Sequence, residues 1–353
     1  MLKRRRSKLE ITDIFIYAFG IFIIAIILYG SFETLRQGKY SASQWADLFV
    51  FGITIGGIYA LIALGYTMVY GILQMINFAH SEVFMAGPLT AFFLADALAK
   101  SGLLATNPAI SLLLIFAFSM IVSTTVAVLL ERIAYRPLRH APRLVPLITA
   151  IGASFFLQYA FRGLFGTQFK VYPEIPALEG VVTIGVVRLT YTQILVMISA
   201  AALMIGLQAF VQRTRTGKAM RAVAESRESA ALMGINVDSI ILTTFVLGGA
   251  LAGAAGVLYA LVFTQVSFAM GFIPGIKAFT AAVLGGIGII PGAMLGGLFL
   301  GIVESVGPTL FLDGLNIAAP YQLKDAIAFT LLVLVLIFRP SGIMGGQTQE
   351  KKA

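Results

Sequence analysis

"MVYGILQMINFAHSEVFMAG", residues 68–87, lies between two strongly apolar stretches and carries Asn77, His80, Ser81 and Glu82 within six positions. The whole chain has only two histidines, so a histidine in such surroundings needs a physical reason. Its role depends on whether the run lies in water, in lipid or in a path between helices. Polar groups at membrane depth are costly without partners, and they normally face a protein interior or a water-filled path.

The composition answers the question of surroundings. Of the 353 residues, 59% are hydrophobic and 12% are charged, and the mean hydropathy is +0.93. Soluble domains are about a quarter charged, and a soluble chain of this length could not bury so much apolar surface. Windows of about twenty apolar residues instead predict membrane-spanning helices. We therefore expect an all-α, polytopic integral membrane protein.

The apolar stretches predict where the helices lie. The run from Ile14 to Tyr29 follows the basic N-terminus and is expected to be a retained first helix, although a cleaved signal peptide is the alternative. The region 276–308 is too long for one span, and its Gly-rich centre predicts two short helices joined at a bend. We expect about eight to ten spans, with the remaining ones at 48–73, 83–99, 109–130, 144–165, 191–211, 239–263 and 321–338.

The basic residues predict the orientation. The net charge of +9 is concentrated at the ends of apolar stretches, in the loops 131–143 and 213–238 and at both termini, which does not favour a nucleic-acid partner. Lys and Arg are enriched in cytoplasmic loops. Both termini and both loops are therefore expected in the cytoplasm, and 166–190 outside.

Small residues recur at four-residue spacing in three stretches. Such stripes let helix backbones approach closely within a membrane, and packing is the role expected for most of them. The residues are Gly52, Gly56, Gly248, Ala252, Gly256, Gly288, Gly292 and Gly296.

Motifs of enzymes are missing from the sequence. It has no nucleotide-binding G-x-x-x-x-G-K-[ST], no H-E-x-x-H and no G-x-S-x-G. It has no cysteine, which excludes disulfides, thiolate metal sites and cysteine nucleophiles. We expect neither catalytic residues nor a metal site nor a cofactor.

The cytoplasmic loop 213–238 predicts a docking element. Residues 219–234 favour a short helix that ends at Gly234. Within "ESAALMG" (228–234), small residues on one face would let the helix seat in a groove of another protein. An ordinary solvated loop helix is the alternative. Residues predicted to couple to a partner are Glu228, Ala230, Ala231 and Gly234.

Three stretches together resemble the branched-chain amino-acid (leucine/isoleucine/valine-type) permeases of ABC importers. They are "YALIALGYTMVYGILQMINFAHSEVFMAG", "GINVDSIILTTFVLGGALAGAAGVLYAL" and "AFTAAVLGGIGIIPGAMLGGLFLGIVES". The 228–234 segment is similar to the E-A-A-x-x-x-G loop of such permeases, with Ser229 in place of the first Ala. The N-F-A-H run is typical of the first (H-type) permease subunit, although Ser81 stands where Gly is usual.

The resemblance implies an ABC importer permease fold with broken helices and a cytoplasmic coupling helix, in a prokaryotic inner membrane. It implies a homologous second permease subunit, two ATPase subunits and an extracytoplasmic binding protein as partners. It divides the chain into an N-terminal segment 1–45, a permease domain 46–340 and a tail 341–353. Substrates of the wider family include leucine, isoleucine and valine, other amino acids, urea and short amides.

Two questions stay open at the level of sequence. Asn77, His80, Ser81 and Glu82 are candidates for lining the translocation path. Alternatively, Asn77 and His80 tie two helices together by hydrogen bonds or lie in a loop at the cytoplasmic edge, and they would share a face if the segment is helical. A secondary transporter or channel working alone is the alternative function, for which Glu82, Glu304 and Asp325 are candidate ion-coupling carboxylates. A membrane assembly protein is a further alternative.

Overall fold

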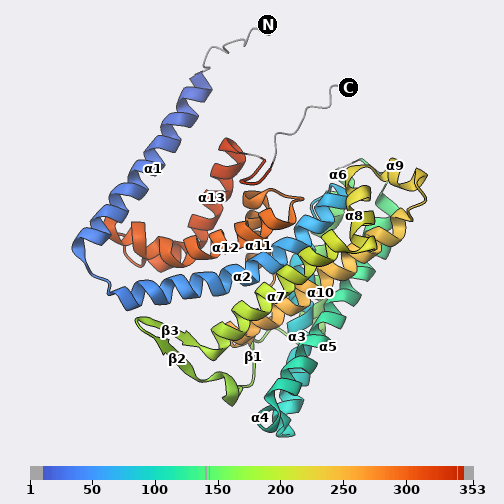
Figure 1. The fold of residues 1–353 in the computed structure, drawn as a ribbon, viewed down its shortest axis with the longest axis horizontal. Helices are drawn as coiled ribbons and strands as arrows, with labels where there is room; N and C mark the ends of the chain where they lie inside the picture. Colours follow the sequence, from blue (N-terminus) through green and yellow to red (C-terminus); the bar gives the residue numbers. More distant parts are fainter. Residues whose placement is uncertain (1–10, 140, 143, 340, 346–353) are drawn as a thin grey trace.

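The computed structural model describes residues 11–139, 141–142, 144–339 and 341–345, and the backbone alone for residues 11–17 (Figure 1). Several residues that entered the sequence predictions lie outside the described part. They are the basic residues 3–6, His140, Arg143 and the tail from 346 onward.

The described part is built almost entirely of helices, which confirms the predicted all-α membrane fold. Nine of its helical segments are long and apolar enough to cross a bilayer. The long helices are α1 (Ile11–Gln37), α2 (Ala42–Leu73), α3 (His80–Lys100), α5 (Pro108–Leu129), α6 (Leu144–Phe165), α7 (Tyr191–Arg213), α10 (Val237–Phe263), α12 (Ile290–Gly307) and α13 (Lys324–Phe338). Shorter helices are α4 (Leu103–Thr106), α8 (Arg215–Glu225), α9 (Arg227–Leu232) and α11 (Phe272–Gly285).

Several helices end in tighter or wider turns. The π-turns η1 (Leu130–Tyr135) and η4 (Pro308–Leu312) extend α5 and α12, and the 3₁₀ turns η2 (Arg136–Leu138) and η5 (Asp313–Leu315) follow them. Two further 3₁₀ turns, η3 (Pro176–Leu178) and η6 (Pro320–Leu323), lie in loops.

The region 276–308 forms the bend that its glycines predict. Helices α11 and α12 are joined by a tight turn in which Gly286 and Gly288 have φ of +106° and +93°, a conformation that favours glycine. The carbonyl groups at the end of α11 are satisfied from the far end of the chain, because the backbone N–H of Ile343 donates to Leu284 O. With 14 residues, α11 spans only about 21 Å. The turn that follows it nevertheless reaches the last turn of α2, because a Cβ added at Gly71 would lie 3.7 Å from Gly288.

The loops gather at two opposite ends of the molecule (Figure 1). At one end lie α4, the hairpin β2 (Val181–Ile184) and β3 (Val187–Thr190), and the antiparallel pair β1 (Lys170–Val171) and β4 (Gln265–Val266). The β1–β4 pair joins the loop after α6 to the loop after α10. At the other end lie the α2–α3 loop, η2 and the pair α8 and α9. We call these the strand end and the loop-helix end.

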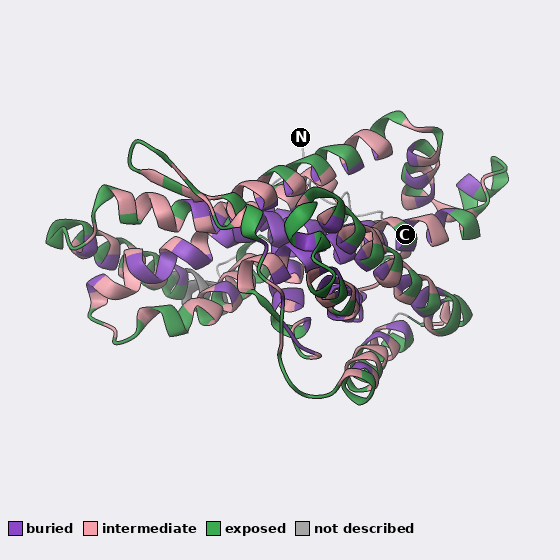
Figure 2. Cartoon of the chain, turned by 90° about the horizontal axis from the view of Figure 1, so that it is seen from below, coloured by how far each residue is buried: buried purple, intermediate pink, exposed green. Residues whose placement is uncertain are grey.

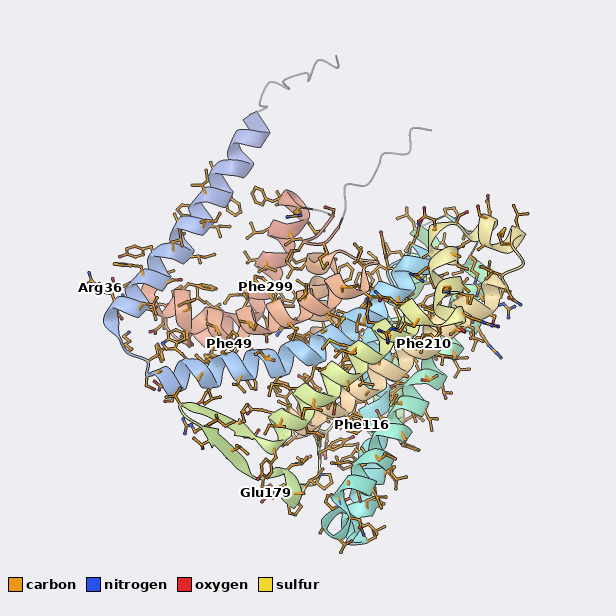
Figure 3. The ribbon with its side chains drawn as sticks, in the orientation of Figure 1. Arg36, Phe49, Phe116, Glu179, Phe210 and Phe299 are labelled. Atoms are coloured by element: carbon orange, nitrogen blue, oxygen red, sulfur yellow. The ribbon has the colours of Figure 1, made fainter. Side chains whose placement is uncertain are left out.

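Helix α2 lies at the centre of the fold. In its most apolar window 78% of the residues are buried within the chain, against 17% for α6. Figure 2 shows the buried residues gathered in the middle and the exposed ones along the outer helices. Large apolar side chains on the outside, such as Phe49 of α2 and Phe299 of α12 in Figure 3, are about half exposed. Such a surface suits lipid. Most of α2, in contrast, is surrounded by protein.

Glycines bring α12 against α2 at backbone distance. A Cβ added to Gly52 or Gly56 would lie 2.8–2.9 Å from the backbone of Ile302 or Leu298. On the facing helix, a methyl at Gly301 would overlap the backbone of Gly56. The two helices therefore meet without intervening side chains.

The other small residues that the sequence singled out have varied positions. Gly292 and Gly296 of α12 face the backbone of α11, and Gly256 of α10 faces Pro88 and the Phe84 carbonyl of α3. Ala252 is fully buried in α10. The expectation of a helical stripe was wrong for Gly288, which lies in the α11–α12 turn.

Gly301→Ala should lower the stability of the folded chain. Because the added methyl group has no space against α2, we expect a loss of about 1–3 kcal/mol. The matched control is Gly152→Ala on α6, where an added Cβ meets no described atom within 4 Å and alanine favours the helix. Thermal unfolding of both variants in detergent measures the difference. Equal melting temperatures would show that the α2–α12 contact tolerates a side chain.

Candidate functional site

The polar run 77–82 lies where α2 breaks before α3. Helix α2 ends at Leu73, and Gln74 follows in the left-handed conformation with φ of +52°. Residues 74–79 are not helical, and α3 begins at His80. Asn77 and His80 would share a helix face only if the whole segment were helical, and this condition is not met, because α3 starts after Asn77. The break also lies away from Gly87 and Pro88, which are inside α3.

Asn77 connects this break to the end of α5. Its side chain is 3% exposed, and its Oδ1 accepts a 2.6 Å hydrogen bond from the hydroxyl of Tyr135, itself 2% exposed. Tyr135 is the last residue of the π-turn that extends α5. A buried amide without this partner would be costly, so the pair holds the α2–α3 loop against the end of α5.

His80 lies between helices and is 2% exposed. Its ring meets the Tyr66 ring edge to face at 5.0 Å. A methyl at Gly65 would overlap His80 Nε2, and a Cβ at Gly248 would lie 3.7 Å from Cε1. The imidazole thus occupies the space that two glycines leave between α2 and α10. It has a backbone hydrogen bond with Ile62, while Nε2 has no partner among the described residues.

Ser81 borders a small cavity of about 160 Å³, and Glu82 contacts Ser154, another residue that lines it. Ser81 lines it together with Ser154 of α6, and its hydroxyl donates to the Phe78 carbonyl at 2.7 Å. Its backbone is helical, so serine at this position requires no positive φ. Glu82, 1% exposed, accepts a hydrogen bond from Ser154 at 3.2 Å. The polar run therefore divides: Asn77 and His80 contact other helices, and Ser81 borders a cavity.

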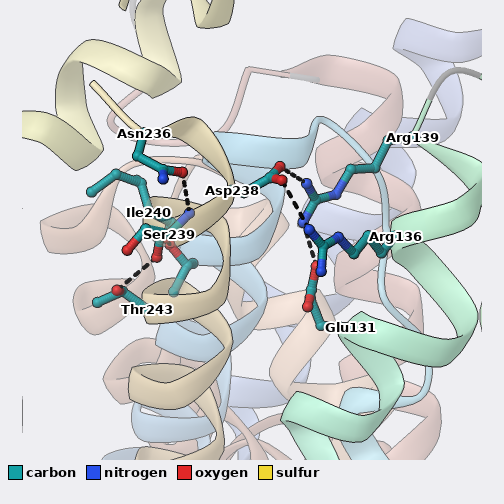
Figure 4. A network of polar contacts seen from close by, with 9 residues as sticks. Glu131, Arg136, Arg139, Asn236, Asp238, Ser239, Ile240 and Thr243 are labelled. Carbon is teal, nitrogen blue, oxygen red and sulfur yellow. Dashed lines mark hydrogen bonds and ion pairs between the residues drawn. The ribbon is translucent and has the colours of Figure 1, made fainter. Parts of the chain in front are cut away.

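A chain of ion pairs ties the loop-helix end together (Figure 4). Arg139 pairs with both Glu131 and Asp238, and Arg136 pairs with Asp238 at 3.1 Å. Glu131 is 2% exposed, and a buried carboxylate of this kind requires a cation. Asp238 is the last residue of the 213–238 segment and belongs to the first turn of α10. The end of α5 is thus fixed to the start of α10.

The 213–238 loop contains two helices, and the expected single helix over 219–234 was wrong. Helix α8 ends at Glu225 and α9 begins at Arg227. Between them Ser226 is extended and caps α9, because its hydroxyl accepts the backbone N–H of Ser229. Local capping by this serine interrupts a stretch of good helix propensity.

Gly234 ends α9 through a Schellman motif. Its φ is +80°, its N–H donates to Ala231 O, and the next N–H, of Ile235, donates to Ala230 O. The small residues do not share one free face, because Ala230 is 3% exposed and packs against its own chain, whereas Ala231 is exposed. Glu228 is exposed as well.

Arg227 attaches α9 to the end of α2. Its Nε and Nη2 donate to the carbonyl oxygen of Ile72 at 3.0 and 2.7 Å. That carbonyl lies in the last turn of α2, where helical partners run out. Burial, and next the charge of Arg139, lower the pKa of the Arg227 guanidinium. A cavity of about 390 Å³ lies here, lined by the end of α2, by Tyr135 and by residues 223–228.

Sequence reasoning missed several residues of this region. Leu232 and Met233 at the tip of α9 are 89% and 83% exposed. Two adjacent apolar residues before the terminal glycine were the available signal. Tyr135, Ser154 and Arg227 became visible only through their contacts, since nothing in the local pattern pairs them with 72–82.

The fold and the buried polar run define a polytopic membrane protein of the permease class. Residues 48–336 match the model of a family described as the permease component of the branched-chain amino acid transport system. The chain belongs to this family of branched-chain amino acid transport permeases.

Curated relatives agree with the family over most of the chain. It is 48% identical over 303 residues to the high-affinity branched-chain amino acid transport system permease protein BraD of Pseudomonas aeruginosa. The aligned region covers 85% of this chain and 95% of the relative. It is 42% identical over 305 residues to LivH of Escherichia coli strain K12, with the same two coverages. A probable LivH of Methanocaldococcus jannaschii is 27% identical over 311 residues, covering 85% of this chain and 92% of the relative. No solved structure matches the chain.

His80→Gln should retain more folded protein and more transport than His80→Leu. Glutamine can still donate to the backbone of Ile62, whereas leucine removes this additional hydrogen bond at a cost of about 0.5–1.5 kcal/mol. The measurements are the melting temperature in detergent and solute uptake by the assembled transporter. Equal values for the two variants would show that the ring acts by its volume alone.

Proposed function

We propose that this chain is a permease subunit of an ATP-driven, binding-protein-dependent importer that carries branched-chain amino acids into the cytoplasm. The membership of residues 48–336 in the permease family is the observation that carries the proposal. The relatives BraD and LivH, named as proteins of high-affinity branched-chain amino acid transport, support the substrate class. The chain is not an enzyme, and ATP hydrolysis belongs to separate subunits.

The proposed assembly follows the family. A homologous second permease subunit completes the pore, two ATPase subunits bind at the loop-helix end, and an extracytoplasmic binding protein delivers the substrate at the strand end. Residues 46–340 form the permease domain, preceded by the segment 1–45 and followed by the tail 341–353. The protein lies in the inner membrane with both termini in the cytoplasm. The basic loops support this orientation, because they lie at the loop-helix end together with α8 and α9.

We propose α9 as the helix that docks on the ATPase. Its tip offers Leu232 and Met233 as exposed apolar contacts, with Glu228 and Ala231 beside them. Arg227 connects α9 to the last turn of α2, directly before the 74–79 break. A movement of α9 would therefore be transmitted through the contact of Arg227 with Ile72 and through the 74–79 loop to Asn77 and the start of α3. This geometry supports a role in coupling as well as in docking.

Ion-coupled transport by this chain alone receives less support. Two of the three carboxylates that would favour it, Glu304 and Asp325, share the ammonium group of Lys277. The third, Glu82, has hydroxyl partners in Ser81 and Ser154. Urea and short amides remain alternative substrates for the test.

Uptake into liposomes tests the proposed function. The complete importer, reconstituted with its binding protein, should accumulate labelled leucine only when ATP is present on the ATPase side. Uptake driven by an ion gradient without ATPase subunits would contradict the proposal. Competition by unlabelled isoleucine, valine, urea and acetamide identifies the substrate class, and inhibition by urea or acetamide alone would overturn the assignment to amino acids.

Changes at the tip of α9 should separate the permease from its ATPase. Gly234→Trp places a side chain at φ of +80° and destroys the Schellman motif, so we expect loss of ATPase co-purification and of uptake. Leu232→Ser should weaken both by removing an apolar contact. Glu228→Ala should weaken them only slightly, because an exposed pair contributes about 0.2–1 kcal/mol.

Val186→Ser, at an exposed apolar residue of the β2–β3 turn, is the matched control for Leu232→Ser. All four variants should insert into the membrane in normal amounts, since these positions lie outside the spans. If Gly234→Trp keeps both the ATPase and transport, α9 is not the coupling element.

A further inference from the structure

Three charged side chains meet between the helices near the strand end. Lys277 of α11 pairs with Glu304 of α12 at 2.7 Å and with Asp325 of α13 at 2.6 Å. The side chains of Lys277 and Glu304 are 3% and 8% exposed, whereas that of Asp325 is 37% exposed. One ammonium group is shared by two carboxylates, so the cluster keeps an excess negative charge at a depth where charge is costly.

One oxygen of this cluster lies outside the ion pairs. Lys277 contacts Oε1 of Glu304, whereas Oε2 is buried and the neighbouring polar group of this carboxylate is the Tyr59 hydroxyl, so no cation faces Oε2 among the described residues. A buried carboxylate oxygen without a cation beside it is costly, because it has lost its hydration. A ligand that brings a positively charged donor would remove that cost.

The cluster forms the polar wall of a cavity of about 350 Å³. Aromatic and apolar side chains also line it, among them Tyr259, Phe263, Met270 and Ile273. Lys324 also lines the cavity and forms no ion pair among the described residues. The cavity thus offers carboxylates, a separate cation and an apolar wall, and its volume lies in the usual range of small-molecule sites.

We propose that this cavity binds the free amino acid at the strand end of the translocation path, an inference that rests on the proposed import of amino acids. The α-ammonium group binds between Glu304 Oε2 and Asp325, and the α-carboxylate binds Lys324. The aliphatic side chain packs against Tyr259, Phe263 and Ile273. Lys277 is a positioning residue, because its ion pairs hold both carboxylates at the wall of the cavity.

The site should bind weakly and release readily. The incoming ammonium group competes with Lys277 for the same two carboxylates, so part of the interaction energy is lost in rearranging the existing ion pairs. Weak binding suits a transport path, since a tight site would trap the substrate. Selection between an amino acid and its amine or acid analogue requires Asp325 and Lys324 together.

Protection of an introduced thiol tests the site directly, because the native chain has no cysteine. Ala269 is exposed and lines the cavity, and Ala269→Cys is labelled in the complete importer in nanodiscs, without nucleotide, by an impermeant maleimide. With increasing leucine the labelling rate should fall as 1/(1 + [L]/Kd), to about one tenth when leucine is at about ten times its Kd. We expect weaker protection by 3-methylbutylamine, which lacks the carboxylate, and none by 4-methylpentanoate, which lacks the ammonium group.

Variants and a control assign the protection to the cluster. In the Ala269→Cys background, Asp325→Asn and Lys324→Gln should each reduce the protection by leucine. The control is Ala105→Cys, at an exposed alanine of α4 at the same end, whose labelling rate leucine should leave unchanged. The proposed site would be overturned if leucine left the maleimide labelling rate of Ala269→Cys unchanged. It would also be overturned if protection by leucine persisted in both the Asp325→Asn and the Lys324→Gln variants. Leucine uptake by the same preparation is measured in parallel. Normal ATP-driven leucine uptake without protection of the thiol would contradict the proposed site alone. Protection of the thiol without ATP-driven uptake would contradict the proposed function alone.

Discussion

The close approach of α2 and α12 is the contact on which the rest of the structure depends. Lipid is as apolar as the side chains, so burial from water contributes little to helix association in a bilayer. Attraction must come from packing at short range, and the packing here is backbone against backbone. Gly56 and Gly301 allow it because neither carries a Cβ. With α12 held in this way, the α11–α12 bend follows, and α11 brings Lys277 to the side of Glu304.

Free backbone groups at the helix ends explain much of the polar chemistry. Every break in a helix leaves carbonyl or N–H groups that lipid cannot satisfy. The last turn of α2 is satisfied by Arg227, and the end of α11 by the backbone of Ile343. In both cases the partner comes from a distant part of the chain. The irregular segments therefore act as fixed joints between helices.

The loop-helix end connects the proposed docking helix α9 to the polar run 77–82. Arg227 contacts Ile72, the 74–79 loop follows, and Asn77 contacts Tyr135 at the end of α5. Glu131, Arg139 and Asp238 continue from α5 to α10. These contacts join four helices within one region, so the asparagine serves as a joint. His80 fills the interior one turn further into the membrane, where two glycines make room for its ring.

The sequence by itself determined the class of the protein. Apolar windows specified the spanning helices, the glycine-rich centre of 276–308 specified a bend, and three motifs specified the permease family. These features are local or periodic, and each can be recognised from residue type and spacing. The terminal glycine of α9 was predictable for the same reason, since only glycine adopts its conformation freely.

Only the tertiary structure decided which polar groups pair. Ser226 splits the expected helix 219–234 by capping α9, and Ala230 proves to be buried under its own chain. The partners Asn77 and Tyr135 are 58 residues apart, and Lys277 and Glu304 are 27 apart. Such pairs depend on how helices rotate and slide against one another. Helix packing sets that geometry, and it cannot be deduced from the spacing of residues within one helix.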